Sequence, residues 1–156
     1  MSSGFDEPLR VLLVEDNPGD TKWFQLTLDD LQFAYVLQVA ENGEDALQIL
    51  RNSHSDGKSM PHIVFLDLNL PGLTGGEVLE IWRTESDQAA QLPICVLTSS
   101  PLERRLLLER FQIQPQCYLL KPVTPETFLT ALECFEPFRP LAKDIRARLT
   151  PGNWHG

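Results

Sequence analysis

The sequence predicts an α/β protein, built on a doubly wound, five-stranded parallel sheet with a C-terminal extension. Five short apolar runs recur, and most lack polar–apolar alternation, which is typical of parallel strands buried on both faces. Segments with helical spacing lie between the runs, so the pattern indicates five successive β-then-α units. The predicted strands are Arg10–Val14, Tyr35–Ala40, His62–Leu66, Ile94–Leu97 and Cys117–Leu120.

Four of the five predicted helices carry an apolar stripe, because their apolar residues share one helical face. The stripes are Phe24, Leu28 and Leu31; Ala46, Leu47 and Leu50; Val78, Leu79 and Trp82; and Phe128, Leu129, Leu132 and Phe135. Asn17-Pro18 is a start signal for the first helix and Thr124-Pro125-Glu126 for the last. The remaining helix, Leu102–Phe111, is poorly patterned.

A chain of 156 residues with 42% apolar residues fits one globular domain with a full core. We place this domain at residues 9–136, after a short tail (1–8) and before an extension (137–156) that is too short for an output domain. No apolar stretch approaches the roughly 20 residues that cross a bilayer. The N-terminus lacks the regions of a signal peptide, so we expect no secretion.

Charge and cysteine content narrow the choice of partners and compartment. The net charge of −9 argues against nucleic acid, since no cluster of Lys and Arg could neutralise a phosphate backbone. Cys95, Cys117 and Cys134 are odd in number and lie in or beside apolar segments. We therefore expect reduced core thiols in a cytoplasmic protein.

Polar side chains stand where four of the apolar runs end. The first run ends in Glu15-Asp16, the third in Asp67, the fourth in Thr98-Ser99-Ser100 and the fifth in Lys121-Pro122. Ligands of such sheets bind at the carboxyl ends of the strands, near the point where the strand order reverses. The sequence therefore predicts one polar site at this edge.

The acids of this site favour a divalent cation. Three carboxylates in one cleft repel one another, and Mg²⁺ relieves that repulsion through one or two carboxylates, waters and phosphate oxygens. We expect Asp16 and Asp67 to be direct ligands and Glu15 to act through water. The backbone carbonyl of Asn69 would be the remaining protein ligand of the ion.

Asp67 is the candidate phosphate acceptor, because a carboxylate held on Mg²⁺ can attack a phosphoryl group. Lys121 would give a positive charge to the phosphoryl oxygens and Thr98 a hydrogen bond, while the small Ser99 leaves room. Taken singly, each residue has a plainer interpretation: helix-start acids, a loop acid, an N-cap or a surface lysine. Their combination overturns these interpretations. For Tyr118, plain packing and a switching role remain close alternatives.

The sequence resembles a receiver domain of two-component signalling, with the CheY-like, flavodoxin-type fold, over residues 9–136. A narrower similarity, to the small stand-alone response regulators of phytochrome histidine kinases, rests on "EDNPGD", "LDLNLPG", the Cys-Tyr-Leu before the lysine, and the aromatic, proline-containing tail. The motifs of the broader resemblance are "VLLVEDNPGD" (Glu15, Asp16), "IVFLDLNLPGLTG" (Asp67), "VLTSS" (Thr98) and "CYLLKP" (Tyr118, Lys121).

The resemblance implies phosphotransfer from the histidine of a sensor kinase, of phytochrome type on the narrower match, to Asp67. The protein would be a phosphoacceptor that assists its own phosphorylation and dephosphorylation rather than an enzyme. Thr98 would then move towards the phosphoryl group and Tyr118 inward, repacking the face of the fourth and fifth helices of the fold. We also expect a cis peptide at Lys121-Pro122, which would aim the lysine at the site.

Two alternative functions fit the sequence less well. A phosphatase of the haloacid dehalogenase type has a different chain order and needs an acid two residues after its nucleophile, where this chain has Asn69. A receiver-shaped adaptor that never accepts phosphate would not need the complete set of side chains.

The surplus apolar residues predict a symmetric dimer. Leu106-Leu107-Leu108 covers about 200° of a helix, so one face cannot bury all three. The alternatives there are partial exposure, or a patch that binds a kinase or a second subunit. Leu141, Ile145 and Leu149 form a stripe in the extension, which either folds back on its own sheet or reaches a twin subunit as a dimerisation arm.

Overall fold

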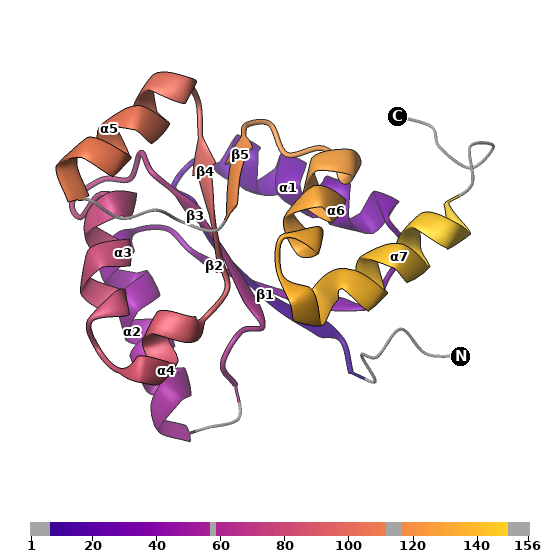
Figure 1. Cartoon of the computed structure of the whole chain (residues 1–156), viewed down its shortest axis with the longest axis horizontal. Helices are drawn as coiled ribbons and strands as arrows, with labels where there is room; N and C mark the ends of the chain where they lie inside the picture. Colours follow the sequence, from indigo (N-terminus) through magenta and orange to yellow (C-terminus); the bar gives the residue numbers. More distant parts are fainter. Residues whose placement is uncertain (1–6, 57–58, 112–116, 150–156) are drawn as a thin grey trace.

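The computed structural model describes residues 7–56, 59–111 and 117–149. Its centre is a five-stranded, all-parallel sheet in the order β2-β1-β3-β4-β5 (Figure 1). This confirms the predicted doubly wound fold. The strands are β1 (Leu9–Val14), β2 (Tyr35–Ala40), β3 (Ile63–Asp67), β4 (Ile94–Thr98) and β5 (Cys117–Leu120).

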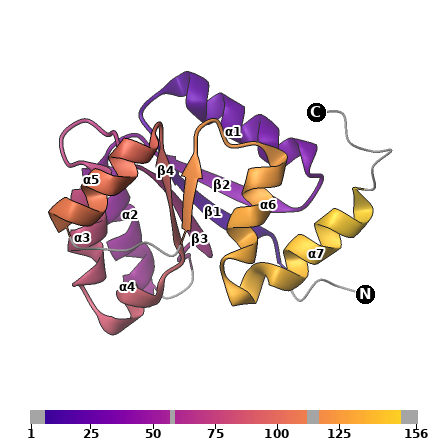
Figure 2. The same cartoon turned by 45° about the horizontal axis from the view of Figure 1, so that its top comes forward.

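Helices cover both faces of the sheet. Helices α1, α6 and α7 lie on one face, and α2 to α5 lie on the other (Figures 1 and 2). None of the helices in the described ranges is long and apolar enough to span a lipid bilayer. The helices are α1 (Pro18–Asp30), α2 (Gly43–Asp56), α3 (Gly75–Arg83), α4 (Asp87–Gln91), α5 (Pro101–Phe111), α6 (Pro125–Glu133), the 3-10 turn η1 (Glu136–Phe138) and α7 (Arg139–Arg148).

The apolar runs are continuous because both faces of the central strands are buried. Successive side chains of a strand point to opposite faces, so β1 sends Val11 and Leu13 into the core under α1 and α6. Its Leu12 and Val14 enter the core under α2 and α3. Strand β2 differs, since partly buried and exposed residues alternate along it and Val36 is about half exposed, as suits an edge strand.

Local capping explains two features of the helical layer. Thr74 and Glu77 form a capping box at the start of α3, where each side chain bonds the other's backbone N–H. The short helix α4, which sequence periodicity does not reveal, is capped by Ser86. Five residues are too few to display a helical stripe, so only the folded chain identifies this helix.

Residues 137–149 of the C-terminal extension fold back onto the rest of the chain. Leu141, Ile145 and Leu149 are buried in the same core cluster as α1 and α6. Arg146 forms ion pairs with Glu126 and Glu133 on α6, which fix the outer side of α7. Residues 139–149 therefore follow the first of the two predicted alternatives, in which the stripe packs on its own sheet. A role of α7 in dimerisation would have to use its exposed side.

We expect Ile145→Ala to lower the free energy of unfolding by about 2–5 kcal/mol, because it leaves a cavity under α7. Urea denaturation followed by circular dichroism measures this loss. Lys143→Ala, on the exposed side of the same helix, is the matched control and should change stability by less than about 0.5 kcal/mol. Equal effects of the two substitutions would mean that α7 contributes little to the core.

Candidate functional site

The candidate site lies at the carboxyl edge of the sheet, around the ends of β1 and β3. Strand β2 lies on one side of β1, and the chain then crosses to place β3 on the other side. The strand order therefore reverses next to β1. A pocket at this edge is lined by side chains from four strand ends and from the start of α1. Its polar lining includes Glu15, Asp16, Asp20, Asp67, Ser99 and Lys121.

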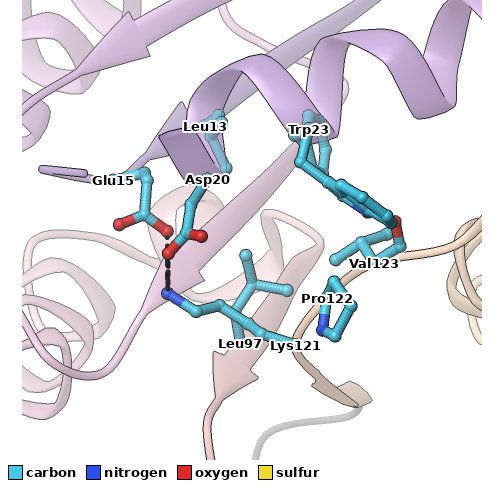
Figure 3. Close-up of a pocket in the computed structure, with 9 residues that line it drawn as sticks. Leu13, Glu15, Asp20, Trp23, Leu97, Lys121, Pro122 and Val123 are labelled. Carbon is cyan, nitrogen blue, oxygen red and sulfur yellow. Dashed lines mark hydrogen bonds and ion pairs between the residues drawn. The ribbon is translucent and has the colours of Figure 1, made fainter. Parts of the chain in front are cut away.

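Lys121 joins the acids of the site. Its Nζ lies 2.8 Å from Asp67 Oδ2, 3.0 Å from Glu15 Oε1 and 2.8 Å from Asp20 Oδ2. Figure 3 shows the ammonium group directed towards the carboxylates of β1 and α1. Burial acts to lower the pKa of Lys121, but hydrogen bonds to the three carboxylates outweigh it, so the pKa lies above its usual range. Lys121 is therefore a fixed positive charge.

The backbone around Lys121 is held in place on both sides. The Lys121–Pro122 peptide is cis, as predicted. Lys121 N donates to Thr98 O at the end of β4. After the proline, Val123 O accepts hydrogen bonds from Trp23 Nε1 (2.9 Å) and Thr27 Oγ1 (2.8 Å) of α1. Figure 3 shows the ring of Trp23 beside Val123. The loop that carries the lysine is thus attached to α1 and to β4.

Three acids gather as the sequence predicts. Glu15, Asp16 and Asp67 each offer one carboxylate oxygen, and these oxygens lie within 4.8 Å of one another. Glu15 and Asp67 are buried, while Asp16 is exposed. With Asp20, the site holds four carboxylates against one lysine, a surplus of negative charge in oxygen ligands that suits a hard divalent cation.

Burial also affects the proton affinity of Glu15. Desolvation raises the pKa of its carboxyl group to about 7, and the hydrogen bond from Lys121 only partly opposes this effect. The nearby carboxyl group of Asp67 acts in the same direction as burial and contributes to this raised pKa. A cation at the site would favour the charged form of Glu15.

Asp67 has both carboxylate oxygens engaged. Oδ2 accepts from Lys121, and Oδ1 accepts a hydrogen bond of 2.9 Å from the backbone N–H of Asn69. Asn69 lines the same pocket. The contribution of its carbonyl to metal binding stays a prediction, as do the individual roles of the other site residues.

Asp20 is the site residue that the sequence analysis missed. It lies in the first turn of α1, where its backbone N–H bonds the N-cap side chain of Asn17 at 3.0 Å. In this fold the first turns of the helices lie at the same edge of the sheet as the strand ends. An acid in the first turn of the helix that follows the first strand is therefore a candidate site residue, and this criterion would have identified Asp20.

Thr98 is placed differently from the other predicted residues. The side chain is buried, and its hydroxyl lies 2.7 Å from Glu103 Oε1 and 2.8 Å from Ser100 O. Ser100 Oγ caps α5 by accepting from Glu103 N at 3.3 Å. Ser100 is therefore the residue that caps α5, whereas the hydroxyl of Thr98 contacts Glu103 in the first turn of that helix.

Tyr118 packs inward in this structure. Its ring contacts the core cluster under α2 and α3, and the guanidinium carbon of Arg104 lies 4.2 Å from the ring centroid. The hydroxyl is buried and has no hydrogen-bond partner within the described ranges. The ring and the hydroxyl of Tyr118 therefore both lie in the interior.

Comparisons with known proteins agree with this geometry. The family model of the response regulator receiver domain matches residues 11–133. The chain is 33% identical over 129 residues to the probable methanogenesis regulatory protein FilR2 of Methanothrix harundinacea, covering 82% of this chain and 81% of FilR2. It is 28% identical over 139 residues to the response regulator Rcp1 of Synechocystis, covering 88% of this chain and 93% of Rcp1.

Solved structures show the same similarity. The bacteriophytochrome response regulator AtBRR superposes with a TM-score of 0.72 at 34% identity, over 82% of this chain and 92% of AtBRR. The Mn²⁺-bound form of Rcp1 superposes with a TM-score of 0.64 at 28% identity, over 80% of this chain and 89% of Rcp1. The similarity therefore covers nearly the whole of these two proteins.

The raised pKa of Glu15 predicts how stability depends on pH when metal is chelated. The folded state holds the Glu15 proton up to about pH 7, whereas the unfolded state releases it near 4.5. Its contribution to stability is full below pH 4.5 and is lost as pH rises through 7.

Urea unfolding in EDTA at pH 5 and pH 7.5 tests this expectation. The wild type should lose stability between these values by on the order of 1 kcal/mol more than Glu15→Gln, whose amide does not titrate. The same slope in both proteins would show that Glu15 has an ordinary pKa.

Proposed function

The chain belongs to the response regulator receiver family, and on that premise we propose that it is a phosphoacceptor of a sensor histidine kinase. Asp67 receives the phosphoryl group. The observation that carries this proposal is the position of Asp67, whose Oδ2 lies 2.8 Å from Lys121 Nζ in a pocket rimmed by two further acids of the cluster.

The transfer step follows from these contacts. An oxygen of the Asp67 carboxylate attacks the phosphorus of a phosphohistidine, and the imidazole nitrogen leaves with the electrons of the broken P–N bond. The phosphoryl group keeps its charge on three oxygens. Lys121 donates to these oxygens, and the Asn69 N–H holds the attacking carboxyl group in one orientation.

Mg²⁺ is the proposed cofactor. Asp16 and Asp67 would bind it directly, Glu15 would act through a water, and the carbonyl of Asn69 would complete the protein ligands. When bound, the ion supplies positive charge that offsets the acids and the arriving phosphoryl group. The cluster of three carboxylate oxygens and the Mn²⁺-bound form of the similar protein Rcp1 support this assignment.

The phosphorylated protein is proposed to change the surface formed by α5, β5 and α6. Thr98 moves to the phosphoryl group, and α5 repacks over Tyr118. Three apolar side chains are more than half exposed on the first two of these elements: Leu102, Leu106 and Leu120. The side chains of Leu107 and Leu108 lie outside the described part of the structure. We propose that this surface forms a symmetric homodimer, which sedimentation measured over a range of concentrations would detect.

The kinase is proposed to be of the phytochrome type. This rests on the similarity to AtBRR, a bacteriophytochrome response regulator. The pathway is then cytoplasmic, and the acidic chain has neither nucleic acid nor membrane as a partner.

We expect Asp67→Asn to abolish labelling by acetyl phosphate, because the amide cannot act as the nucleophile. Intact-mass measurement detects the added phosphoryl group, and circular dichroism verifies that the variant is folded. A persistent label at this position would refute the acceptor assignment. Sustained turnover of p-nitrophenyl phosphate by the wild type would instead indicate a phosphatase.

We expect Asp16→Asn to weaken Mg²⁺ binding by about tenfold or more, since the site loses one of its charged ligands. A titration that follows tryptophan fluorescence can measure this, because Trp23 lines a neighbouring pocket together with Asp20 and Lys121 of the site. Asp30→Asn, at the far end of α1, is the matched control and should bind as the wild type does. Unchanged affinity in Asp16→Asn would remove Asp16 from the ligand set.

A further inference from the structure

Glu103 makes an unusual set of contacts at the start of α5. Ser100 and Glu103 have the spacing of a capping box, in which the acid normally bonds the N–H of the capping residue. Here the carboxylate reaches further back: Oε1 accepts from Ser99 N at 2.7 Å and lies 2.7 Å from Thr98 Oγ1. Glu103 thus binds two consecutive donors at the end of β4.

The hydroxyl of Thr98 has one proton and two acceptors within reach. Ser100 O is a neutral carbonyl at 2.8 Å, whereas Glu103 Oε1 carries charge and lies at 2.7 Å. A charged acceptor forms the stronger hydrogen bond, and burial of Thr98 shields that bond from water. The carboxylate of Glu103 therefore holds the hydroxyl towards α5.

These donors are the ones that a phosphoryl group on Asp67 would use. Ser99 lines the pocket around Asp67, and Thr98 precedes it on the same strand end. We propose that Glu103 is a positioning residue that competes with the phosphoryl group for the hydroxyl of Thr98 and the N–H of Ser99. This inference rests on the proposed function, in which Thr98 turns to the phosphoryl group.

The competition connects the site to the rest of α5. Glu103 and Arg104 are neighbours in the first turn of that helix, and Arg104 lies over the ring of Tyr118. When the phosphoryl group takes Thr98 and Ser99, Glu103 loses both donors. The turn that contacts Tyr118 is then released from β4, so one helical turn links the two switch residues.

Beryllofluoride, a non-covalent mimic of the phosphoryl group, tests this competition in the full-length protein with Mg²⁺. The variants are Glu103→Ala, which removes the competing acceptor, and Glu103→Gln, which keeps an acceptor without charge. Glu109→Ala, at an exposed position of the same helix, is the matched control. The dissociation constant is measured from tryptophan fluorescence.

We expect Glu103→Ala to bind beryllofluoride about tenfold more tightly than the wild type, because the two charge-assisted hydrogen bonds to Glu103 no longer have to be broken. Glu103→Gln should lie between the two, and Glu109→Ala should match the wild type. A merely structural cap would give the opposite sign, since its loss lowers the melting temperature and loosens the site. Unchanged or weaker binding in Glu103→Ala therefore overturns the inference.

A double-mutant cycle with Thr98→Ala identifies the route of the effect. If Glu103 acts through Thr98, its removal should give a smaller gain in the Thr98→Ala background. An undiminished gain would overturn the role of Thr98 in the competition. Failure of the proposed function is separate: it would appear as a wild type that binds no beryllofluoride.

Discussion

The contact between the ammonium of Lys121 and three carboxylates is the interaction on which the site depends. Glu15, Asp20 and Asp67 come from β1, α1 and β3, and all three lie within 3.0 Å of the same nitrogen. Without that charge the carboxylates would repel one another in a partly buried cleft. Four acids nevertheless exceed one lysine, and this imbalance makes the edge of the sheet receptive to a divalent cation.

The sheet makes this arrangement possible because the strands on which it rests are buried on both faces. Residues of β1 and β3 alternate between the two core clusters, so these strands cannot slide without exposing apolar side chains. The polar groups at their carboxyl ends are therefore presented in a fixed relation. Helix α7 extends one of these clusters, and its Arg146 pairs with two acids of α6, so residues 139–149 pack on the same core.

The start of α5 gives the site a way to affect a distant surface. Thr98 and Ser99 are held by Glu103, while Tyr118 on the neighbouring strand packs under Arg104. Both contacts come from one turn of helix, whose hydrogen bonds keep its residues in register. In the proposed competition, an anion that takes these donors would act on the apolar surface of α5 and β5 without crossing the core.

Much of this protein is determined by local sequence. Apolar runs without alternation identify the buried strands, and the polar residues that end them, such as Asp67 and Lys121, identify the edge where the candidate site lies. Other features depend on contacts between distant segments, which periodicity does not encode. Asp20 faces Lys121 across 101 positions of sequence, and the stripe of α7 fits its own core or a partner's equally well as a pattern. Only packing in three dimensions decided these two, and it also decided that the hydroxyl of Thr98 contacts Glu103, because each outcome depends on which neighbours the fold supplies.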